Sequence, residues 1–424
     1  MYLPVSFPGG EMTTFDQALE VPIASAGRAH VIRTDEEALE VAARLAAEFA
    51  PGAAERDAQR LLPRAELDRL SESGLLAITV PRRYGGADVR ADTLAEVYRL
   101  LAEADPNIAQ IPHSHVVYLR VLAQQGDEEQ QRYFFGEALA GRRFGNAQSE
   151  AGTRHAQDYR TRLVPDGDGG YLLNGEKFYC TGALFAHWVP VLAQLEVPGQ
   201  GDRLHVAYVP RGAPGLEVVD DWTGMGQRLT ASGTVRLRNV WVPAERVVPH
   251  HLTFTGPQVH GAYAQLLHAA IDVGIAGGAL RDAAEFIRTK ARPWPDSGCG
   301  KAAEDPLLIQ RFGELVIAER SARALLAEAG RAVERARHDL TDESAAAASI
   351  AVATAKAVAD RASVEISNAL FELSGTRSSL EEHNLHRHWR NARTHTLHDP
   401  VRWKIQHIGR YALNGTLPPR HGAI

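Results

Sequence analysis

The stretch "TRLVPDGDGGYLLNGEKFYCTG", from Thr161 to Gly182, decides the fold, because here the spacing of apolar residues changes from helical to extended. Its β-branched and aromatic residues stand in short runs that turn-forming Asp, Asn and Gly separate. Similar runs continue to "GTVRLRNVWVP", which ends at Pro243. The middle of the chain is therefore predicted to form a compact β domain, closed or nearly so.

Helical patterns lie on both sides of this region. Apolar residues recur at helical spacing from Asp35 to about Leu139, as in "DTLAEVYRLLAEA". After Pro249, patterns such as "FGELVIAERSARALLAEAGRAVERARH" are long enough for the helices of a bundle. We predict an α+β multidomain protein with an N-terminal helical domain at 1–140, a central β domain at 141–250 and a C-terminal helical bundle at 251–424.

Composition excludes several classes of protein. The 424 residues carry a net charge of -6 from mixed charges, without the basic stripe that nucleic acid or an anionic membrane requires. Cys180 and Cys299 cannot form a disulfide framework, and the N-terminus lacks a secretion signal, so we expect a cytoplasmic protein. The least charged stretch, Tyr263 to Leu280, is interrupted by His268 and Asp272, which predicts a buried helix and not a membrane span.

Three landmarks carry a resemblance to a known family. They are "LSESGLLAITVPRRYGG" at 70–86, "GYLLNGEKFYCTGA" at 170–183 with "DDWTGMGQRLTASGTVRLRNVWVP" at 220–243, and "GIAGGALRDAAEFIRTKARPW" at 274–294. With them the chain resembles the acyl-CoA dehydrogenase superfamily over nearly its whole length. The resemblance implies an N-terminal helical domain, a central β-barrel, a C-terminal four-helix bundle and a homotetramer that binds flavin between subunits.

Further motifs point to one branch of this superfamily. They are "FGNAQSEAGTR" at 144–154, "FYCTGALFAHW" at 178–188 and, above all, "WRNARTHTLHDPVRWKIQHIGRYALNG" at 389–415. Here the chain looks most like the flavin-dependent monooxygenases, which include dibenzothiophene monooxygenase, and among them the SfnB-type sulfur-acquisition oxidoreductases.

The segment after the last bundle helices, at 393–400, distinguishes a predicted monooxygenase from a predicted dehydrogenase. A dehydrogenase needs a carboxylate base facing the flavin, and many members of the superfamily take a glutamate from a segment after the last bundle helices. The comparable place here reads "RTHTLHDP", and no glutamate follows Asn391. Glu150 or Glu372 could in principle substitute, so an FAD-dependent acyl-CoA dehydrogenase stays the alternative.

Two histidines of the tail are the catalytic candidates. A monooxygenase forms a C4a-(hydro)peroxyflavin, which needs hydrogen-bond donors, and an imidazole can donate and pass a proton near neutral pH. His395 and His398 are three residues apart and would share a helix face, and the resemblance places catalysis on His398. His395 could instead pack or cap its helix. Interleaved arginines oppose a metal site among the neighbouring histidines, and we predict none.

The resemblance also implies which residues bind the flavin. It selects Arg292 for the phosphate, although a cation that merely interacts with a helix end would look the same. In "FELSGTRSS" at 371–379, Thr376 and Arg377 stand where FAD enzymes have small residues. These side chains would crowd a diphosphate, and Arg377 could close on a terminal phosphate, so FMN is favoured over FAD.

The ring of the flavin is expected to meet the β domain. By resemblance, Asn146 and Thr181 make polar contacts near the C4a/N5 edge and Trp222 supplies an aromatic wall, with Ser149 and Tyr179 as weaker candidates. On sequence alone these residues read equally well as a turn Asn, a strand Thr and a half-buried Trp.

The substrate is expected beside "NIAQIPHSHVVYLRVL" at 107–122, where Gln110, Ser114 and His115 are candidates for one helix face. Dibenzothiophene monooxygenase has bulkier residues at the first two positions, so a smaller or more polar substrate fits better.

We predict a two-component enzyme that uses O2 to oxygenate a small organosulfur or related compound. It is expected to take reduced FMN from a separate reductase, because no Gly-x-Gly-x-x-Gly unit that could bind NAD(P)H follows a strand. The segment 293–306 reads equally well as a lid or as a surface connection.

Overall fold

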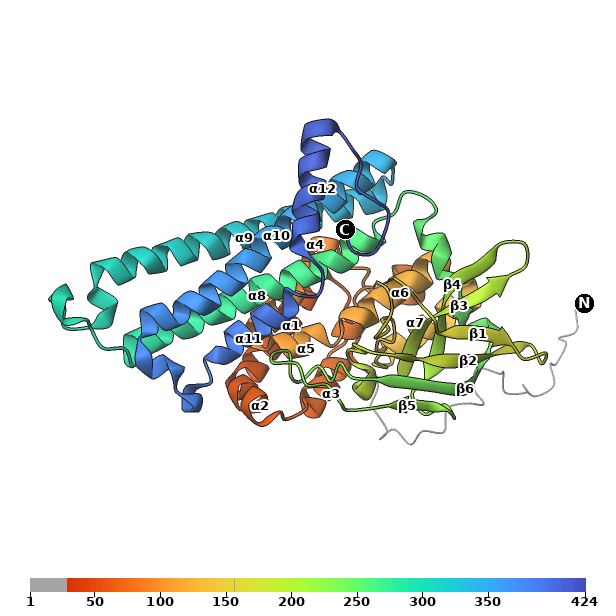
Figure 1. Cartoon of the computed structure of the whole chain (residues 1–424), viewed down its shortest axis with the longest axis horizontal. Helices are drawn as coiled ribbons and strands as arrows, with labels where there is room; N and C mark the ends of the chain where they lie inside the picture. Colours follow the sequence, from red (N-terminus) through yellow and green to blue (C-terminus); the bar gives the residue numbers. More distant parts are fainter. Residues whose placement is uncertain (1–28, 156) are drawn as a thin grey trace, which may run out of the picture.

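The computed structural model describes residues 29–155 and 157–424, which form helical, β-rich and helical regions in that order (Figure 1). The helix α1 (Asp35–Phe49) is capped by Thr34, whose hydroxyl accepts a hydrogen bond from the Glu37 amide at 3.2 Å. The other helices of the first region are α2 (Ala53–Gln59), α3 (Arg64–Glu72), α4 (Ala91–Ala104), α5 (Pro106–Gln110), α6 (His113–Gln125) and α7 (Glu128–Leu139).

The middle region is a seven-stranded sheet of order β5-β6-β2-β1-β3-β4-β7, within the described part of the chain. Its strands are β1 (Arg162–Pro165), β2 (Gly170–Lys177), β3 (Trp188–Val197), β4 (Gly201–Pro210), β5 (Leu216–Val218), β6 (Val235–Pro243) and β7 (Val247–Val248). The predicted β domain is confirmed, but the short strands β5 and β7 lie at the two edges of the strand order and leave the sheet unclosed. One face of the sheet packs against α6 and α7 through large aromatic residues such as Trp188, Phe134 and Tyr208.

The last region is built on three long helices. These are α8 (His260–Thr289), α9 (Pro306–His338) and α10 (Asp342–Ser374), followed by the shorter α11 (His386–His395) and α12 (Val401–Asn414), which projects from the body (Figure 1). As predicted, the stretch with His268 and Asp272 lies in a buried helix, α8. At Gly274 an added Cβ would lie 2.6 Å from the Arg99 carbonyl, so this glycine lets α8 approach α4 closely. None of the described helices combines the length and apolar character needed to cross a membrane.

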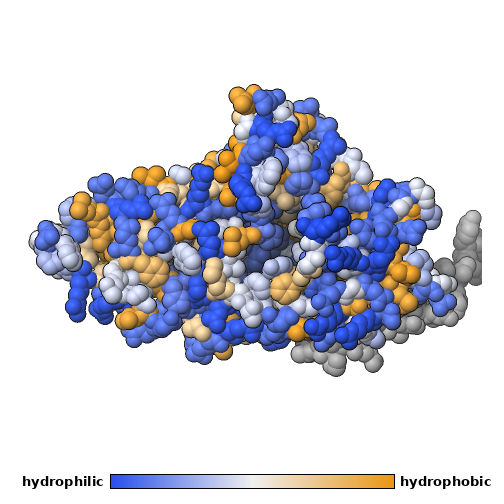
Figure 2. Space-filling model, viewed as in Figure 1, coloured by the Kyte–Doolittle hydropathy of each residue, from blue (hydrophilic) through white to orange (hydrophobic). Residues whose placement is uncertain are grey.

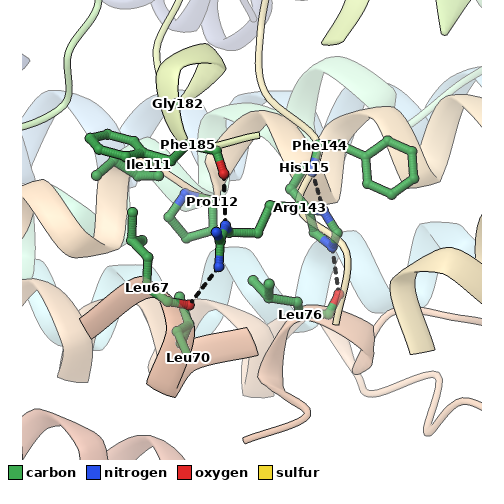
Figure 3. Close-up of a pocket in the computed structure, with 10 residues that line it drawn as sticks. All are labelled: Leu67, Leu70, Leu76, Ile111, Pro112, His115, Arg143, Phe144, Gly182 and Phe185. Atoms are coloured by element: carbon green, nitrogen blue, oxygen red, sulfur yellow. Dashed lines mark hydrogen bonds between the residues drawn. The ribbon is translucent and has the colours of Figure 1, made fainter. Parts of the chain in front are cut away.

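His115 holds the junction between the first region and the sheet (Figure 3). Its Nδ1 accepts a hydrogen bond from the Phe144 amide at 3.1 Å, which leaves the proton on Nε2 to donate to the Leu76 carbonyl at 2.7 Å. Beside it, Arg143 donates to the carbonyls of Phe185 and Leu67. Because backbone groups use both ring nitrogens, we assign His115 to this junction and not to the predicted substrate pocket.

This histidine should make the fold sensitive to acid. Burial lowers the pKa of His115 to about 4, against roughly 6.5 in an unfolded chain. Between these values the unfolded chain binds more protons than the folded one, so stability falls as the pH falls, by roughly 2 kcal/mol between pH 7.5 and 5. His115→Gln should be less stable at pH 7.5, yet lose less unfolding free energy on acidification, as denaturant titrations at both pH values would measure.

The matched control is His338→Gln, because the side chain of His338 is 78% exposed. An identical loss on acidification in the wild type and in His115→Gln would contradict this account.

Candidate functional site

The helix α11 is held from several directions. Arg390 forms an ion pair with the buried Asp57 of α2 and donates to the Met225 carbonyl at 2.9 Å. The Gly226 amide donates to the Thr394 hydroxyl at 3.0 Å. An added Cβ at Gly226 would lie 1.9 Å from the Arg390 carbonyl, so the 219–234 loop, between β5 and β6, rests directly on α11.

The helix α5 joins the sheet to α11. The amide oxygen of Asn107 accepts a hydrogen bond from the Leu229 amide at 3.1 Å, and Gly182 packs so closely that an added Cβ would lie 3.0 Å from the Ile111 carbonyl. Gln110 at the end of α5 contacts His395 of α11. Loops of the sheet, α5 and α11 therefore meet in one place. Figure 2 shows the surface hollowed near the base of α12, on the side toward the sheet.

Four histidines gather at this meeting point. The His268 ring, on α8, lies 4.0 Å from the His113 ring and 3.9 Å from the His398 ring. Its Nδ1 lies 3.1 Å from Nε2 of His395. His395 is buried, whereas the side chain of His398 is 49% exposed. The two predicted catalytic histidines are thus neighbours in unlike environments.

Their partners differ as well. Nδ1 of His395 lies 2.6 Å from a carboxylate oxygen of Asp272, and its Nε2 lies 3.2 Å from the amide oxygen of Gln110. The side chain of His395 therefore belongs to an internal network and does not cap the helix. Helix α11 ends at His395, and His398 lies in the following turn, where its Nδ1 is 3.2 Å from a carboxylate oxygen of Asp399.

Burial controls the charge of the inner histidines. It lowers the pKa of His113 to about 3 and that of His268 well below its ordinary value. Burial also lowers the pKa of His395, although Asp272 opposes this effect. At neutral pH, His113 and His268 are therefore neutral, and each neutral ring offers one donor and one acceptor.

The residues predicted to face the flavin ring lie together on the sheet side. The amide oxygen of Asn146 accepts from the Tyr118 hydroxyl at 3.2 Å, and its amide nitrogen donates to the Tyr179 carbonyl at 3.3 Å. The Tyr179 ring lies 6.0 Å from the ring of Trp222. Two further positions adjoin this group: the hydroxyls of Thr181 and Ser232 lie 2.7 Å apart, and the Ser149 carbonyl accepts from the Phe178 amide.

The residues predicted to bind the phosphate lie elsewhere. Arg292 follows the end of α8, and Arg377, in the turn Thr376–Ser379, donates to the Lys290 carbonyl at 3.2 Å. At 1.5 Å per residue, the end of α8 at Thr289 lies about 32 Å from His268, far more than an FMN molecule spans. One protomer therefore does not bring its own Arg292, Thr376 and Arg377 to its own histidine cluster.

The two glutamates that could act as the base of a dehydrogenase interact with other residues. Glu150 accepts from Nζ of the buried Lys177 at 2.7 Å and from the Thr161 hydroxyl at 2.7 Å. The side chain of Glu372, near the end of α10, is 61% exposed and lies 3.9 Å from Arg311. Neither glutamate contacts the histidine cluster.

Several residues of this site escaped the sequence analysis. His268 and Asp272 were seen only as polar interruptions of an apolar stretch, although their spacing of four places both on one helix face. No motif or spacing in the sequence pointed to Lys356 or Ser232. Among residues 29–155 and 157–424, no group of three or more His, Cys, Asp or Glu side chains is arranged to hold a metal ion.

The chain matches known proteins along most of its length. Domain profiles of acyl-CoA dehydrogenases match in order: the N-terminal domain at 34–142, the middle domain at 144–240 and the C-terminal domain at 266–403. The chain belongs to the acyl-CoA dehydrogenase family. Within this family, a dibenzothiophene monooxygenase of Rhodococcus erythropolis is 36% identical over 91% of this chain and 95% of its own. A probable FMNH2-dependent monooxygenase, SfnC of Pseudomonas putida, is 33% identical over 90% of this chain and 96% of its own.

Solved structures of the same family superpose closely. FMN-bound TdsC from Paenibacillus sp. A11-2 has a TM-score of 0.86 and 31% identity, covering 91% of this chain and all of that one. The methanesulfinate monooxygenase MsuC from Pseudomonas fluorescens has a TM-score of 0.83 and 33% identity, covering 91% and 99%.

Gly226 offers a test of how the site is held together. Gly226→Ala should push the 219–234 loop away from α11, because its Cβ would collide with backbone and not with a flexible side chain. We expect a loss of roughly 1 to 3 kcal/mol of unfolding free energy, measured by denaturant titration, and faster proteolysis of the loop. Gly256→Ala, where an added Cβ meets nothing within 4 Å, is the control. Equal stability of both variants would refute the close contact.

Proposed function

We propose that this protein is an FMNH2-dependent monooxygenase that uses O2 to oxygenate a small organosulfur or related compound. The relatives support the reaction class, since their names or titles call them monooxygenases, TdsC among them, and two of these names or titles specify FMN or FMNH2. Dibenzothiophene and methanesulfinate, named for two of them, are both organosulfur compounds.

One observation of this chain carries the proposal. Where loops of the sheet meet the helical bundle, the side chains that gather are the imidazoles of His113, His268, His395 and His398. A dehydrogenase would need an uncommitted carboxylate base there. Asp272 contacts the cluster from α8, and it is already bonded to Lys356 and His395. Asp399 contacts His398, and it is already paired with Lys404. The site is built to hold and donate protons.

The residues present fit a bound FMN. When reduced and bound, FMN supplies the electrons that activate O2. Asn146 and Thr181 offer polar groups to the ring, and Tyr179 and Trp222 offer aromatic surface beside them. Ser149 adjoins this group.

In this proposal a second copy of the chain binds the phosphate. Arg292, Thr376 and Arg377 are exposed together, about 32 Å from the histidine cluster along α8, so they can reach a flavin held by the sheet of another protomer. We therefore include a homotetramer with shared flavin sites in the proposal. It also includes a separate flavin reductase and, because both cysteines are free thiols and such a reductase needs NAD(P)H, a cytoplasmic location.

Within the site, His398 is the proposed proton donor. Its ring is half-exposed, so it can face a ligand, and it packs on the neutral ring of His268. Gln110 bonds to His395 and would act on the substrate side through that histidine, while Ser114 lies part-buried on α6. Both side chains are polar and neither is aromatic, which supports a small or polar substrate.

Isotope labelling tests the proposed reaction. Protein mixed anaerobically with photoreduced FMN and a panel of sulfides and alkanesulfinates, then exposed to ¹⁸O2, should incorporate one ¹⁸O atom into a product detected by mass spectrometry. An acyl-CoA should not bleach the oxidised flavin on the protein. Bleaching without ¹⁸O incorporation would instead establish the dehydrogenase alternative.

A single substitution tests the role of His398. His398→Phe keeps an aromatic ring beside His268 but cannot donate a proton, so a larger share of the consumed O2 should end as hydrogen peroxide, with product per reduced FMN lowered about tenfold or more. Peroxide and product are measured in the same reaction. His338→Phe, at an exposed histidine on α9, should match the wild type. An unchanged ratio in His398→Phe would remove His398 from the mechanism.

A further inference from the structure

Three charged residues lie buried behind the histidine cluster. Nζ of Lys356, on α10, lies 2.8 Å from a carboxylate oxygen of Asp272, on α8, and also contacts the carboxylate of Asp360. The side chains of Lys356 and Asp272 are both 0% exposed. Burying charges so deeply is costly unless every partner is bonded, and the fold would gain as much from apolar residues of the same size. This cost suggests a function for the cluster beyond stability.

The second carboxylate oxygen of Asp272 determines the orientation of His395. It lies 2.6 Å from Nδ1 of the buried imidazole. Burial opposes ionisation of Asp272, but His395 and Lys356 outweigh it and hold the pKa of Asp272 below its usual value. An ionised carboxylate only accepts hydrogen bonds, so Nδ1 of His395 must carry a proton. The opposite nitrogen, Nε2, then points away from Asp272 and toward His268.

Nε2 of His395 is placed between a donor and an acceptor. It lies 3.1 Å from Nδ1 of His268 and 3.2 Å from the amide oxygen of Gln110. When Nε2 is bare it can accept a hydrogen bond from His268, and when it is protonated it can donate to Gln110. The ring can therefore take up or release a proton at this atom without rotating.

Asp360 leaves the buried charges of Lys356 and Asp272 balanced while His395 is neutral. Burial and the adjacent Asp272 raise the pKa of Asp360 to about 8, so this carboxyl is protonated while His395 is neutral. Burial opposes the charge on Lys356, but Asp272 and Asp360 raise the pKa of Lys356 above its usual value. The other titratable groups near His395 are His268 from α8, His113 from α6 and His398 from the turn after α11. Beyond them, Asp399 contacts His398 and pairs with Lys404 of α12.

We propose that Asp272, backed by Lys356 and Asp360, is a positioning residue that keeps a proton on Nδ1 of His395 and makes Nε2 the atom that exchanges protons with the active site. This inference rests on the proposed monooxygenase function for its chemical purpose, but the arrangement can be tested without turnover.

The first test uses the flavin-free protein. Solid-state ¹⁵N spectra of histidine-labelled protein, with the His395 signals identified by their loss in His395→Gln, should show Nδ1 protonated. In Asp272→Asn the neutral amide can donate or accept, so the two neutral forms of His395 should mix. The pH at which His395 gains its second proton should fall by about one to three units, because the opposite charge is gone.

The helix α8 provides a matched control. Asp282 also bonds to a histidine of α11, since its carboxylate lies 2.9 Å from Nε2 of His388. Asp282→Asn should lower stability but leave the His395 signals unchanged. Because Asp272→Asn leaves Lys356 with Asp360 alone, a second variant, Asp272→Asn with Lys356→Met, removes both charges together and tests the same signals if the single variant does not fold.

The second test measures turnover. With photoreduced FMN, Asp272→Asn should shift O2 consumption toward hydrogen peroxide by about tenfold or more, with FMN affinity unchanged, whereas Asp282→Asn should keep the wild-type ratio. Wild-type His395 signals in both Asp272 variants would overturn the inference. A wild-type protein that forms no oxygenated product would overturn the proposed function, while the spectra would still decide the role of Asp272.

Discussion

The ion pair between Lys356 and Asp272 is the constraint on which the site depends. It joins α10 to α8 in the interior of the bundle, where neither side chain reaches solvent. Removing one partner would leave the other charged and buried, which is far more costly than the pair itself. The two helices are therefore held in one register. The carboxylate that fixes this register is also the one that bonds to His395, so packing of the bundle and orientation of the imidazole are one structural feature.

Helix α11 shows why this constraint matters. With ten residues, and with mostly polar or charged side chains, it is too short to be stable alone, and its position must come from its contacts. Asp57 of α2 holds Arg390, and the 219–234 loop bonds to Asn391 and Thr394. Gln110 of α5 and Asp272 of α8 bond to His395 itself. These contacts come from all three regions of the chain. The histidines at the end of α11 are thus placed by the whole molecule and not by their own helix.

The sequence predicted what depends on local patterns. Apolar spacing identified the three regions, and the motifs around Asn146, Thr181 and Trp222 identified side chains that the structure brings to one face. Local patterns could not reveal Lys356, since it meets Asp272 across 84 positions of the chain. They also suggested His115 as a substrate contact, because helical spacing alone does not show that backbone groups of Leu76 and Phe144 use both its nitrogens. The separation of Arg292 from the histidines is likewise visible only once the length of α8 is known.

The two histidines of the tail are similar in sequence but differ in chemical setting. His395 is enclosed between Asp272, His268 and Gln110, where burial disfavours a charged ring and a neighbouring carboxylate favours it. His398 packs on the outer side of His268 and keeps about half of its surface open. An enclosed imidazole can keep a fixed proton on the nitrogen that faces Asp272, and an open one can meet a ligand and solvent. The neutral ring of His268 contacts both His395 and His398. A change of charge on one of these two histidines therefore alters the pKa of the other. A site of this kind can present a proton to a ligand while excluding water from the group that regulates it.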